Sequence, residues 1–375
     1  MDLICFSHLR WGFVYQRPNH LMSRFARDQR TFFIEEPIAC ADGTPRMEVR
    51  HEAEQLLVCT PCVPEGLSAT ELASVQRELL ERLFRAQRVV PDVLWFYTPM
   101  ALPLADAFAD VGVVYDCMDE LSAFDGAPPE LREREDELFE LADLVFTGGH
   151  ALYRAKRERH PRVYPFPSSV DVEHFRRARV RDVQPRDQAA LAYPRVGFYG
   201  VIDERLDYEL IARIADARPG WQLVMIGPLA KVEEESLPRR PNLHWLGRKG
   251  YDELPLYIGG WNVAIMPFAL NRATRFISPT KTLEYMAAGL PIVSTAIDDV
   301  VDPYGRAGLV AIADQDSFVA AIDAALGARS EEEHAKADAL LARTSWDDTW
   351  SRMNALVGSV RASRASNVEE DVTNV

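Results

Sequence analysis

Short apolar runs alternate with amphipathic helical segments along most of this chain. The apolar runs 3–7 and 31–34, for example, flank a helical pattern at 18–27. Such alternation is typical of parallel sheets that are covered by helices on both faces. The sequence therefore predicts an α/β protein built on doubly wound, Rossmann-like sheets.

The alternation is interrupted between residues 176 and 190. This stretch is rich in Arg, Asp, Gln and Pro and has little apolar periodicity, which indicates a linker. A second alternating series begins at 196–200, and a chain of 375 residues can hold two domains of ordinary size. We predict an N-terminal domain at 1–175, a C-terminal domain at 191–345, an amphipathic helix at 346–361 and a disordered polar tail at 362–375.

The formal net charge of −15 limits the classes of binding partner that we expect. A protein that binds nucleic acid is usually basic, so we expect no such partner. Basic stretches at 154–160 and 176–179 leave peripheral contact with an anionic membrane open, although such runs are more often solvated helix faces. No apolar run approaches the length of a membrane span, and the first residues lack the features of a signal peptide. We therefore expect a cytoplasmic protein.

The five cysteines lie in the first third of the chain, and their odd number favours reduced thiols over a disulfide framework. Cys59 and Cys62 form a C-x-x-C with no second pair, so incidental placement is favoured over a zinc or redox site. No group of His, Cys, Asp or Glu has the spacing of metal ligands, and we expect no metal.

The window 278–295 carries the most chemistry. Ser278 is a good N-cap, Pro279 suits the first helical position and Gly289 suits the position after the helix end. Lys281 in the first turn opposes the helix dipole, which makes sense if a phosphate binds there together with Thr280 and the free backbone N–H groups. Glu284, one turn further on the same face, would reach an attached ribose. The alternative is an ordinary amphipathic helix before a buried strand.

This window resembles the donor motif of retaining GT-B glycosyltransferases of group 1, written E-x7-E followed by Gly-x-Pro-Val-Val-x-Thr. In that family the second acid contacts the ribose of a nucleotide sugar, and Glu284 matches it. The first acid, which contacts the sugar, would fall on Phe276, where this chain departs from the pattern. The resemblance implies two Rossmann-like domains facing each other across a cleft, no metal, and the helix 346–361 crossing back to the first domain. The segments 17–21 and 115–124 are similar to bacterial cell-surface polysaccharide transferases.

Loops that follow the other strands supply further candidates, because open parallel sheets bind ligands at the carboxyl ends of their strands. In the loop 7–20, Gly12 and Arg17 could bind phosphate, and His20 could be catalytic or a helix-face residue. Asp116 and Asp119 follow another strand; either could orient the sugar or an acceptor hydroxyl, or cap the next helix. The resemblance places Gly200 and Arg205 at the diphosphate, although Val201 stands where relatives carry Arg. It also places Arg248 and Tyr251 near the nucleobase.

The sequence thus predicts a glycosyltransferase that moves a sugar from a nucleotide sugar, with a UDP-sugar expected first, to a glycan or lipid-linked acceptor. The predicted catalytic residues are Asp119, Asp116 and Lys281. A catalytically silent GT-B scaffold for a partner transferase stays open, because Phe276 and Val201 replace functional residues of the family. A sugar-nucleotide 2-epimerase shares the fold and also stays open. The oligomeric state is not predicted.

Overall fold

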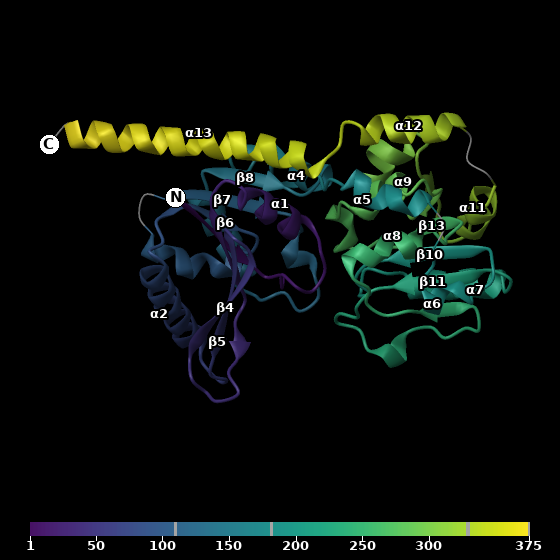
Figure 1. The fold of residues 1–375 in the computed structure, drawn as a ribbon, viewed down its shortest axis with the longest axis horizontal. Coiled ribbons are helices and arrows are strands. Elements are labelled where there is room, and N and C mark those ends of the chain that lie inside the picture. The colour runs from purple at the N-terminus through teal and green to yellow at the C-terminus, as the bar shows by residue number, and fades with distance from the viewer. Residues whose placement is uncertain (109–110, 181–182, 328–330, 374–375) are drawn as a thin grey trace. The chain divides into compact units, whose positions relative to one another are not determined.

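The computed structural model describes residues 1–108, 111–180, 183–327 and 331–373. It divides the chain into two compact units, each built on one sheet (Figure 1). The first unit comprises Met1–Phe166 and Asp347–Val375, and the second comprises Pro167–Trp346. The predicted linker at 176–190 therefore lies inside the second unit.

The first unit contains a nine-stranded sheet in the order β3-β5-β2-β1-β6-β7-β8-β9, with β4 also paired to β5. Its pairs are parallel except β4 with β5, which is antiparallel. The strands are β1 (Asp2–Ser7), β2 (Arg30–Glu35), β3 (Ile38–Ala39), β4 (Arg46–Ala53), β5 (Leu56–Val63), β6 (Pro91–Phe96), β7 (Gly112–Cys117), β8 (Leu144–Thr147) and β9 (Val163–Pro165). Without β3 and β4, the strands β5-β2-β1-β6-β7-β8 follow the 3-2-1-4-5-6 order of doubly wound sheets, and β9 adds a seventh strand beside β8.

Helices cover this sheet. They are α1 (Arg17–Phe25), α2 (Ala69–Gln87), η1 (Pro99–Ala107), η2 (Leu121–Ala123), α3 (Leu131–Leu141), α4 (His150–Lys156) and α13 (Trp346–Thr373). The start of α2 is a capping box: the Ser68 hydroxyl accepts a hydrogen bond from the Glu71 N–H, and the Glu71 carboxylate accepts one from the Ser68 N–H.

The C-terminal helix α13 packs on the first unit. Arg24 of α1 and Arg27, in the turn that follows this helix, both form ion pairs with Asp347, and a Cβ at Gly112 would meet Val360 at 3.2 Å. The helix continues to Thr373, so residues 362–373 are helical and not the disordered tail that their polar composition predicted. Residues 374–375 lie outside the described residues.

The second unit contains a six-stranded, fully parallel sheet in the order β12-β11-β10-β13-β14-β15. Its strands are β10 (Arg195–Tyr199), β11 (Gln222–Ile226), β12 (Leu243–Trp245), β13 (Val263–Met266), β14 (Ile292–Ser294) and β15 (Ala311–Ile312). The order is again 3-2-1-4-5-6, and it reverses between β10 and β13. Ligands of such sheets bind beside the strand ends at this reversal.

The helices of the second unit include the segment predicted to be a linker. They are α5 (Val172–Arg176), η3 (Arg177–Arg179), α6 (Arg186–Ala189), α7 (Tyr208–Ala217), η4 (Glu234–Ser236), η5 (Tyr251–Glu253), α8 (Leu254–Ile258), η6 (Thr274–Phe276), α9 (Lys281–Ala287), α10 (Asp298–Val300), η7 (Val301–Gly305), α11 (Phe318–Ala325) and α12 (Glu331–Leu341). The buried amide of Gln188 donates to the Tyr257 carbonyl and accepts from the Trp261 indole, both at 2.8 Å. Polar residues in this segment thus serve packing, which their composition did not reveal.

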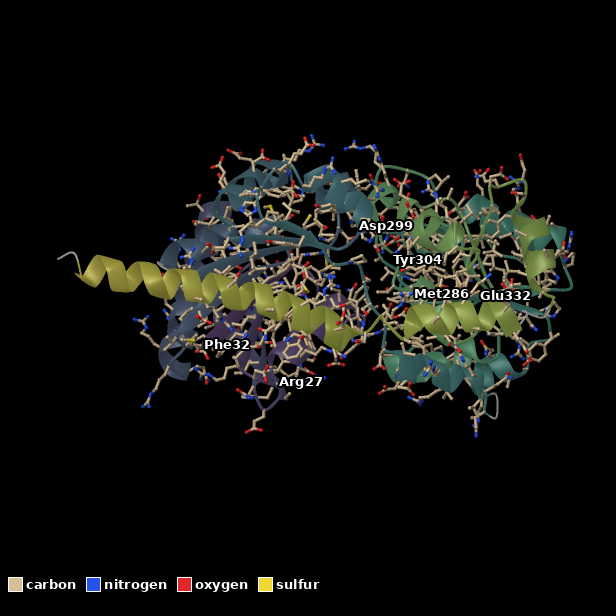
Figure 2. The ribbon with its side chains drawn as sticks, turned by 90° about the horizontal axis from the view of Figure 1, so that it is seen from above. Arg27, Phe32, Met286, Asp299, Tyr304 and Glu332 are labelled. Atoms are coloured by element: carbon tan, nitrogen blue, oxygen red, sulfur yellow. The ribbon has the colours of Figure 1, made fainter. Side chains whose placement is uncertain are left out.

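Each unit has its own hydrophobic core. Phe32 of β2 and Met286 of α9 are fully buried and mark these cores in Figure 2. In the second unit, a Cβ on Gly197 of β10 would come within 2.0 Å of the Trp261 ring. This glycine therefore lets the indole lie directly on the strand. The parallel sheets confirm the predicted doubly wound α/β architecture.

Candidate active site

Two glycines at the ends of neighbouring strands shape the reversal point of the second unit. Gly200 follows β10 with φ +148°, and Gly227 follows β11 with φ +154°, conformations that favour glycine. A Cβ on Gly227 would lie 1.7 Å from the Gly200 carbonyl oxygen. The two backbones therefore touch in a way that side chains would prevent. The Gly227 N–H donates to the carbonyl of Gly247 at 3.0 Å, which links the end of β12 to the same place.

The side chain of Lys281 lies across Gly200. A Cβ on Gly200 would be 2.2 Å from Cε of Lys281 and 2.7 Å from its Nζ. The ammonium group also lies 5.7 Å from the centre of the Phe198 ring. The structure thus brings together Gly200 and Lys281, which are 81 positions apart and were both predicted to bind the donor. Their meeting places a positive charge at the carboxyl end of β10.

The start of α9 differs from the prediction. The helix begins at Lys281 with Thr280 as N-cap, and no side chain caps it. Ser278 and Pro279 therefore precede the helix and are not its N-cap and first residue. Thr280 has helical dihedral angles, and its carbonyl accepts a hydrogen bond from the Glu284 N–H at 3.2 Å. Because α9 has only seven residues, its dipole is a secondary source of positive potential at the helix start. The Lys281 ammonium is the main source.

The end of α9 follows the prediction. Gly289 has φ +78°, and its N–H bonds to the Met286 carbonyl at 2.9 Å. The Leu290 N–H bonds to the Tyr285 carbonyl at 3.0 Å, which completes a Schellman motif. Arg179 adds a hydrogen bond from Nε to the Ala287 carbonyl at 2.8 Å. The glycine and the arginine together satisfy carbonyl groups that the helix leaves open.

Glu284 is buried beside Tyr199, with 7% of its surface exposed. The Tyr199 hydroxyl donates to the Glu284 carboxylate, and the Tyr199 N–H donates to the Tyr285 hydroxyl at 3.0 Å. Burial raises the pKa of Glu284 to about 7, although the Tyr199 hydrogen bond and the Lys281 charge act in the opposite direction. The carboxyl group can therefore accept or donate a hydrogen bond near neutral pH. Sequence reasoning missed Tyr199, whose one signal was its position immediately before Gly200.

Arg205 is held by a carboxylate from its own loop. Its Nε lies 3.0 Å from both Asp203 oxygens, and its Nη2 lies 2.6 Å from Oδ2. Asp203 is 6% exposed, so this bidentate pair is largely screened from water. The predicted contact of Arg205 with a diphosphate stays a prediction, and Asp203 offsets the charge that Arg205 would bring to it.

Tyr251 and Arg248 follow β12. The Tyr251 ring stacks on His174, with ring centres 4.1 Å apart and planes inclined by 8°, and its carbonyl lies 3.0 Å from His174 Nε2. Burial lowers the pKa of His174, so the imidazole is neutral at pH 7. Arg248 is exposed on the turn. Their predicted role at a nucleobase remains untested by this arrangement.

In the first unit, Arg17 and Asp116 form a buried bidentate ion pair. Arg17 Nη2 lies 2.8 Å from Asp116 Oδ1, and Nε lies 3.0 Å from Oδ2. Arg17 Nη1 also donates to the Phe166 carbonyl at 2.7 Å. Burial alone would lower the pKa of Arg17, but the charge and hydrogen bonds of Asp116 outweigh it and raise that pKa. The two predicted site residues are therefore partners of each other, and Asp116 caps no helix.

Gly12 and His20 lie on either side of Arg17 in the sequence. His20 is 4% exposed, and its ring lies edge-on to Tyr15 with centres 4.7 Å apart. Gly12 is exposed, and a Cβ there would meet nothing within 4 Å. The loop is held by Glu35, whose carboxylate accepts the Trp11 N–H at 2.7 Å. His20 is thus a buried residue of α1, and its predicted catalytic role stays a prediction.

Asp119 is half-buried in a loop that is fixed on both sides. A Cβ on Gly148 would lie 2.5 Å from the Met118 carbonyl oxygen, so the loop after β7 rests directly on the loop after β8. On the other side, Glu120 forms an ion pair with buried Lys156 at 2.7 Å. Of the two candidate aspartates, Asp116 is fully buried, and Asp119 is the half-buried one, whose charge also helps to raise the pKa of Arg17.

The basic stretch 154–160 is not an open cationic face. Lys156 is 5% exposed, and its Nζ lies 2.8 Å from a Glu135 oxygen. Arg159 also bonds to Glu135, at 2.7 Å. In the other stretch, Arg179 pairs with Asp338 at 2.6 Å. Internal carboxylates thus offset much of the charge that the sequence pattern displayed.

Metal sites, membrane-spanning helices and disulfides are three further features that the described residues allow us to check. Within them there is no group of three or more His, Cys, Asp or Glu side chains that could hold a metal ion. None of the described helices is both long and apolar enough to cross a membrane. All five cysteines are buried free thiols.

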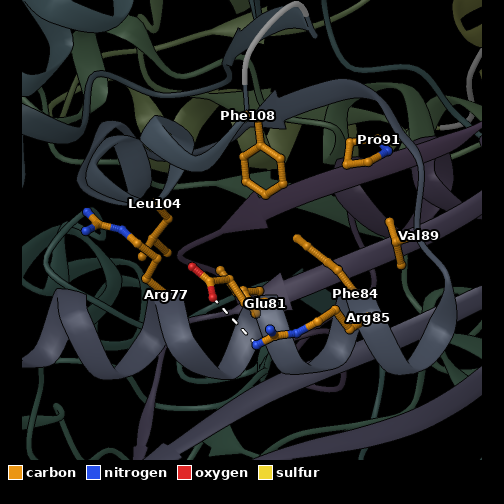
Figure 3. A pocket seen from close by; sticks show the side chains of 9 residues that line it. Arg77, Glu81, Phe84, Arg85, Val89, Pro91, Leu104 and Phe108 are labelled. Carbon is orange, nitrogen blue, oxygen red and sulfur yellow. Dashed lines mark ion pairs between the residues drawn. The ribbon is translucent and has the colours of Figure 1, made fainter.

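A pocket of about 270 Å³ lies in the first unit, beside α2 and η1. Figure 3 shows Phe84 and Arg85 of α2 with Phe108 and Pro91 around it. None of the predicted site residues lines this pocket. The pocket therefore belongs to a different part of the surface from the candidate active site.

Comparison with known proteins identifies the class. Residues 194–327 match the family model described as Glycosyl transferases group 1. A candidate teichuronic acid biosynthesis glycosyltransferase of Bacillus subtilis (strain 168), TuaH, is 26% identical over 274 residues, which cover 67% of this chain and 68% of that protein.

Solved structures share the fold. An alpha,alpha-trehalose-phosphate synthase (UDP-forming) from Burkholderia vietnamiensis has a TM-score of 0.70 at 15% identity and covers 97% of this chain and 99% of its own. A sucrose-phosphate synthase from Thermosynechococcus elongatus has a TM-score of 0.69 at 14% identity, with 96% and 99% covered. The chain is thus a glycosyltransferase with the GT-B fold. Its resemblance to group 1 is confirmed, and the matched region holds Gly200, Lys281 and Glu284.

Proposed function

We propose that this enzyme transfers a sugar from a nucleoside-diphosphate sugar, held by the second unit, to a glycan or lipid-linked acceptor. The observation that carries the proposal is the position of Lys281 across Gly200, whose carbonyl oxygen touches Gly227, with Glu284 buried on the same helix. Glycine at the two strand ends lets the backbones and the Lys281 side chain come together at the point where such sheets bind ligands, and the ammonium supplies the charge that a diphosphate requires.

The chemistry needs positive potential where the leaving group develops charge. Cleavage of the bond between the anomeric carbon and the diphosphate oxygen leaves an oxocarbenium-like sugar and an anionic leaving group. Lys281, fixed across Gly200, would stabilise that anion without reorganising during the reaction. This mode of stabilisation requires no metal ion, and retention of the anomeric configuration is proposed from the family resemblance.

Glu284 is proposed to bind the ribose of the donor. Its carboxyl group is already held by the Tyr199 hydroxyl, so its orientation is fixed before a ligand arrives. A ribose hydroxyl could donate to the ionised carboxylate, which would favour the charged form and lower the raised pKa. Tyr199 would then act as a positioning residue behind Glu284.

A UDP-sugar is the donor that we propose first. The solved neighbours include a UDP-forming synthase and a protein from E. coli bound with UDP-2-fluoro glucose. The name of the relative TuaH refers to teichuronic acid, a polysaccharide, which supports a glycan acceptor. Asp119 is proposed to orient the acceptor hydroxyl or the sugar.

A donor screen with the full chain tests the proposal. Thermal shifts would be recorded with UDP, GDP, ADP and TDP sugars for the wild type, Lys281→Ala and the control Lys231→Ala. Lys231 lies on the same unit, is 53% exposed and pairs with Glu204, outside the glycine pair. We expect one nucleotide class to stabilise the wild type and the control, and the shift to disappear in Lys281→Ala. Equal shifts in all three proteins would contradict the phosphate role of Lys281.

The alternative is a catalytically silent scaffold, which the bidentate pairing of Arg205 with Asp203 favours, since relatives use cations here for the diphosphate. The same screen separates the two proposals: a scaffold shows no shift with any nucleotide. If a nucleotide binds, product analysis distinguishes a glycoside from a free epimer.

A lipid-linked acceptor would bring the enzyme to a membrane surface from the cytoplasmic side. We propose such peripheral contact only together with that acceptor, because the stretches 154–160 and 176–179 are largely paired with internal carboxylates. Flotation with anionic liposomes at low salt tests it. Failure to co-migrate would leave a soluble glycan as the proposed acceptor.

A further inference from the structure

Strand β4 forms an open edge of the first unit's sheet. It pairs with β5 along one side, and in the described part of the chain no strand pairs with its other side. Seven of its eight residues are exposed, and the β4–β5 hairpin can be followed in Figure 1. An exposed edge of this length presents unpaired backbone groups that can bind another strand.

The pairing of β5 shows which backbone groups face β4. The Cys40 N–H donates to the Val63 carbonyl at 2.8 Å, on the side of β5 that also carries β2 and β3. Successive residues of a strand direct their N–H and C=O groups to opposite edges. Thr60 and Val58, an odd number of positions from Val63, therefore direct theirs toward β4.

The opposite edge of β4 follows from its register. Glu48 is paired with Thr60 and Arg50 with Val58, so the backbone groups of Glu48 and Arg50 are used by β5. The backbone groups of Met47, Val49 and His51 must then point to the open edge. The register shifts after His51, which ends the regular edge there.

The side chains along this strand alternate in charge. Arg46, Glu48 and Arg50 occupy every second position of the regular ladder and so share one face of the strand, and Glu52, at the irregularity after His51, stays beside Arg50 through their ion pair. Arg46 and Glu48 lie 3.0 Å apart, and Arg50 pairs with Glu52 in the same way. The row therefore carries no net charge but a definite order of signs.

We propose that β4 pairs in antiparallel orientation with β4 of a second copy of this chain, centred on Val49. In this register Arg46 stands opposite Glu52 and Glu48 opposite Arg50 of the second copy, and the symmetry repeats both pairs. Opposite charges facing each other across strands are favourable, and like charges are not. The contact is isologous, as expected for a closed two-fold dimer.

The order of charges selects this register over its neighbours. A shift that sets Val49 opposite Met47 places Glu48 opposite Glu48 and Arg46 opposite Arg50. The reverse shift, with Val49 opposite His51, places Arg50 opposite Arg50 and Glu48 opposite Glu52. A shift by a single residue would mismatch the outward backbone groups and the side-chain faces. Only the register centred on Val49 pairs every charge with its opposite.

The same register satisfies the backbone. Val49 of each copy exchanges two hydrogen bonds with Val49 of the other, and Met47 does the same with His51. Glu48 and Arg50 then form a non-hydrogen-bonded pair, in which side chains approach most closely. Main-chain hydrogen bonds supply the affinity of such strand addition, and the side chains supply its specificity. The two nine-stranded sheets become one continuous sheet in the dimer.

Charge exchange tests the proposal with the full chain. Glu48→Arg with Glu52→Arg makes the row entirely positive, and Arg46→Glu with Arg50→Glu makes it entirely negative. We expect light scattering after gel filtration to give twice 42.3 kDa for the wild type and 42.3 kDa for each variant alone. An equimolar mixture of the two variants should recover the dimer mass. Added salt should weaken the mixed dimer, because the restoring contacts are exposed charges.

The outcomes are distinguishable because all four positions are on the surface. Circular dichroism should be unchanged in both variants, which shows that loss of the dimer is not loss of fold. Arg82→Glu with Arg85→Glu on α2 serves as a control for net charge, since these arginines are 66% and 75% exposed and lie off the strand. A monomeric wild type at its highest soluble concentration overturns the proposal, as does a dimer that both variants preserve or that the mixture does not restore.

Discussion

The two units use the same strand order but treat charge at the strand ends differently. In the second unit, Lys281 lies across a glycine backbone at the end of β10 and beside a carboxyl group whose pKa burial raises to about 7. In the first unit, Arg17 is enclosed with Asp116 in a bidentate pair. The difference teaches that a charged residue after a strand serves structure when it is enclosed with a buried counterion, as Arg17 is, and is the better candidate for a ligand site when it lies half-buried across a strand end, as Lys281 does. The first unit's charges hold structure, and the second unit's can hold a substrate.

The largest effect should come from breaking the pair in the first unit. Arg17→Ala leaves the fully buried Asp116 carboxylate without its guanidinium, which typically costs about 3–5 kcal/mol. Denaturant unfolding followed by tryptophan fluorescence should show this loss. The control Arg82→Ala removes an exposed pair with Glu78 and should cost less than about 1 kcal/mol. Equal losses in the two variants would show that the first unit's pair is not structural.

Lys281→Ala should show the opposite pattern, with a large loss of activity and a small loss of stability. Removing one preorganised group that stabilises developing charge typically lowers kcat by about 10²–10³-fold. The lysine is only half-buried, so its truncation should leave the unfolding midpoint nearly unchanged. Steady-state kinetics with the donor found in the screen, beside Lys231→Ala, would measure this. A wild-type kcat in Lys281→Ala would mean that this lysine does not stabilise the leaving group, and the proposed functional difference between the two units would be wrong.

Glu284 should make the stability of the protein depend on pH. Its pKa rises from 4.5 to about 7 on folding. Between these values the folded state holds a proton that the unfolded state has released, so the free energy of unfolding falls as pH rises. The total loss above pH 7 is about 3 kcal/mol. Glu284→Gln cannot ionise and should lose less stability between about pH 5 and about pH 8. If the free energy of unfolding of the two proteins changes with pH in parallel, a group other than Glu284 is responsible for the change.

The smallest effect should come from Arg205→Ala. Because Asp203 already offsets its charge, we expect kcat/KM to fall by less than about tenfold, or about 1.4 kcal/mol. Kinetics with the same donor would compare it with Lys281→Ala. A loss of kcat/KM as large as that of Lys281→Ala would mean that Arg205 leaves Asp203 when the donor binds. Arg205 would then contribute to donor binding as Lys281 does.

Several features were predictable because their signals are local. The end of α9 could be predicted because Gly289 suits a position with positive φ. The capping box of α2 is likewise local, since Ser68 and Glu71 are only three positions apart. Strand β4 was not predicted, because an exposed edge strand of alternating charges lacks the apolar run that identifies a buried strand. Its structure depends on pairing with β5, which no local pattern records.

The candidate site divides in the same way. The types and spacing of Lys281, Glu284 and Gly289 were sufficient to predict a donor-binding helix, since these residues lie within one short window. Tyr199 and Asp203 were missed, because the sequence does not show that Tyr199 contacts Glu284 or that Asp203 pairs with Arg205. The start of the helix was misplaced by the Ser-Pro pattern, which is compatible with a cap but does not require one.

By itself, the sequence determined the alternation of strands and helices, and with it the two doubly wound sheets and the glycosyltransferase class. The sheets were predictable because the periodicity of apolar residues and the glycine and proline punctuation act over a few positions, whereas the class came from the resemblance of residues 278–295 to a family motif. Only the tertiary structure decided which charges are neutralised, as in Arg17 with Asp116, and which lie at a strand end, as in Lys281 on Gly200. The physical reason is that a charge depends on burial and on neighbours brought from distant positions of the chain.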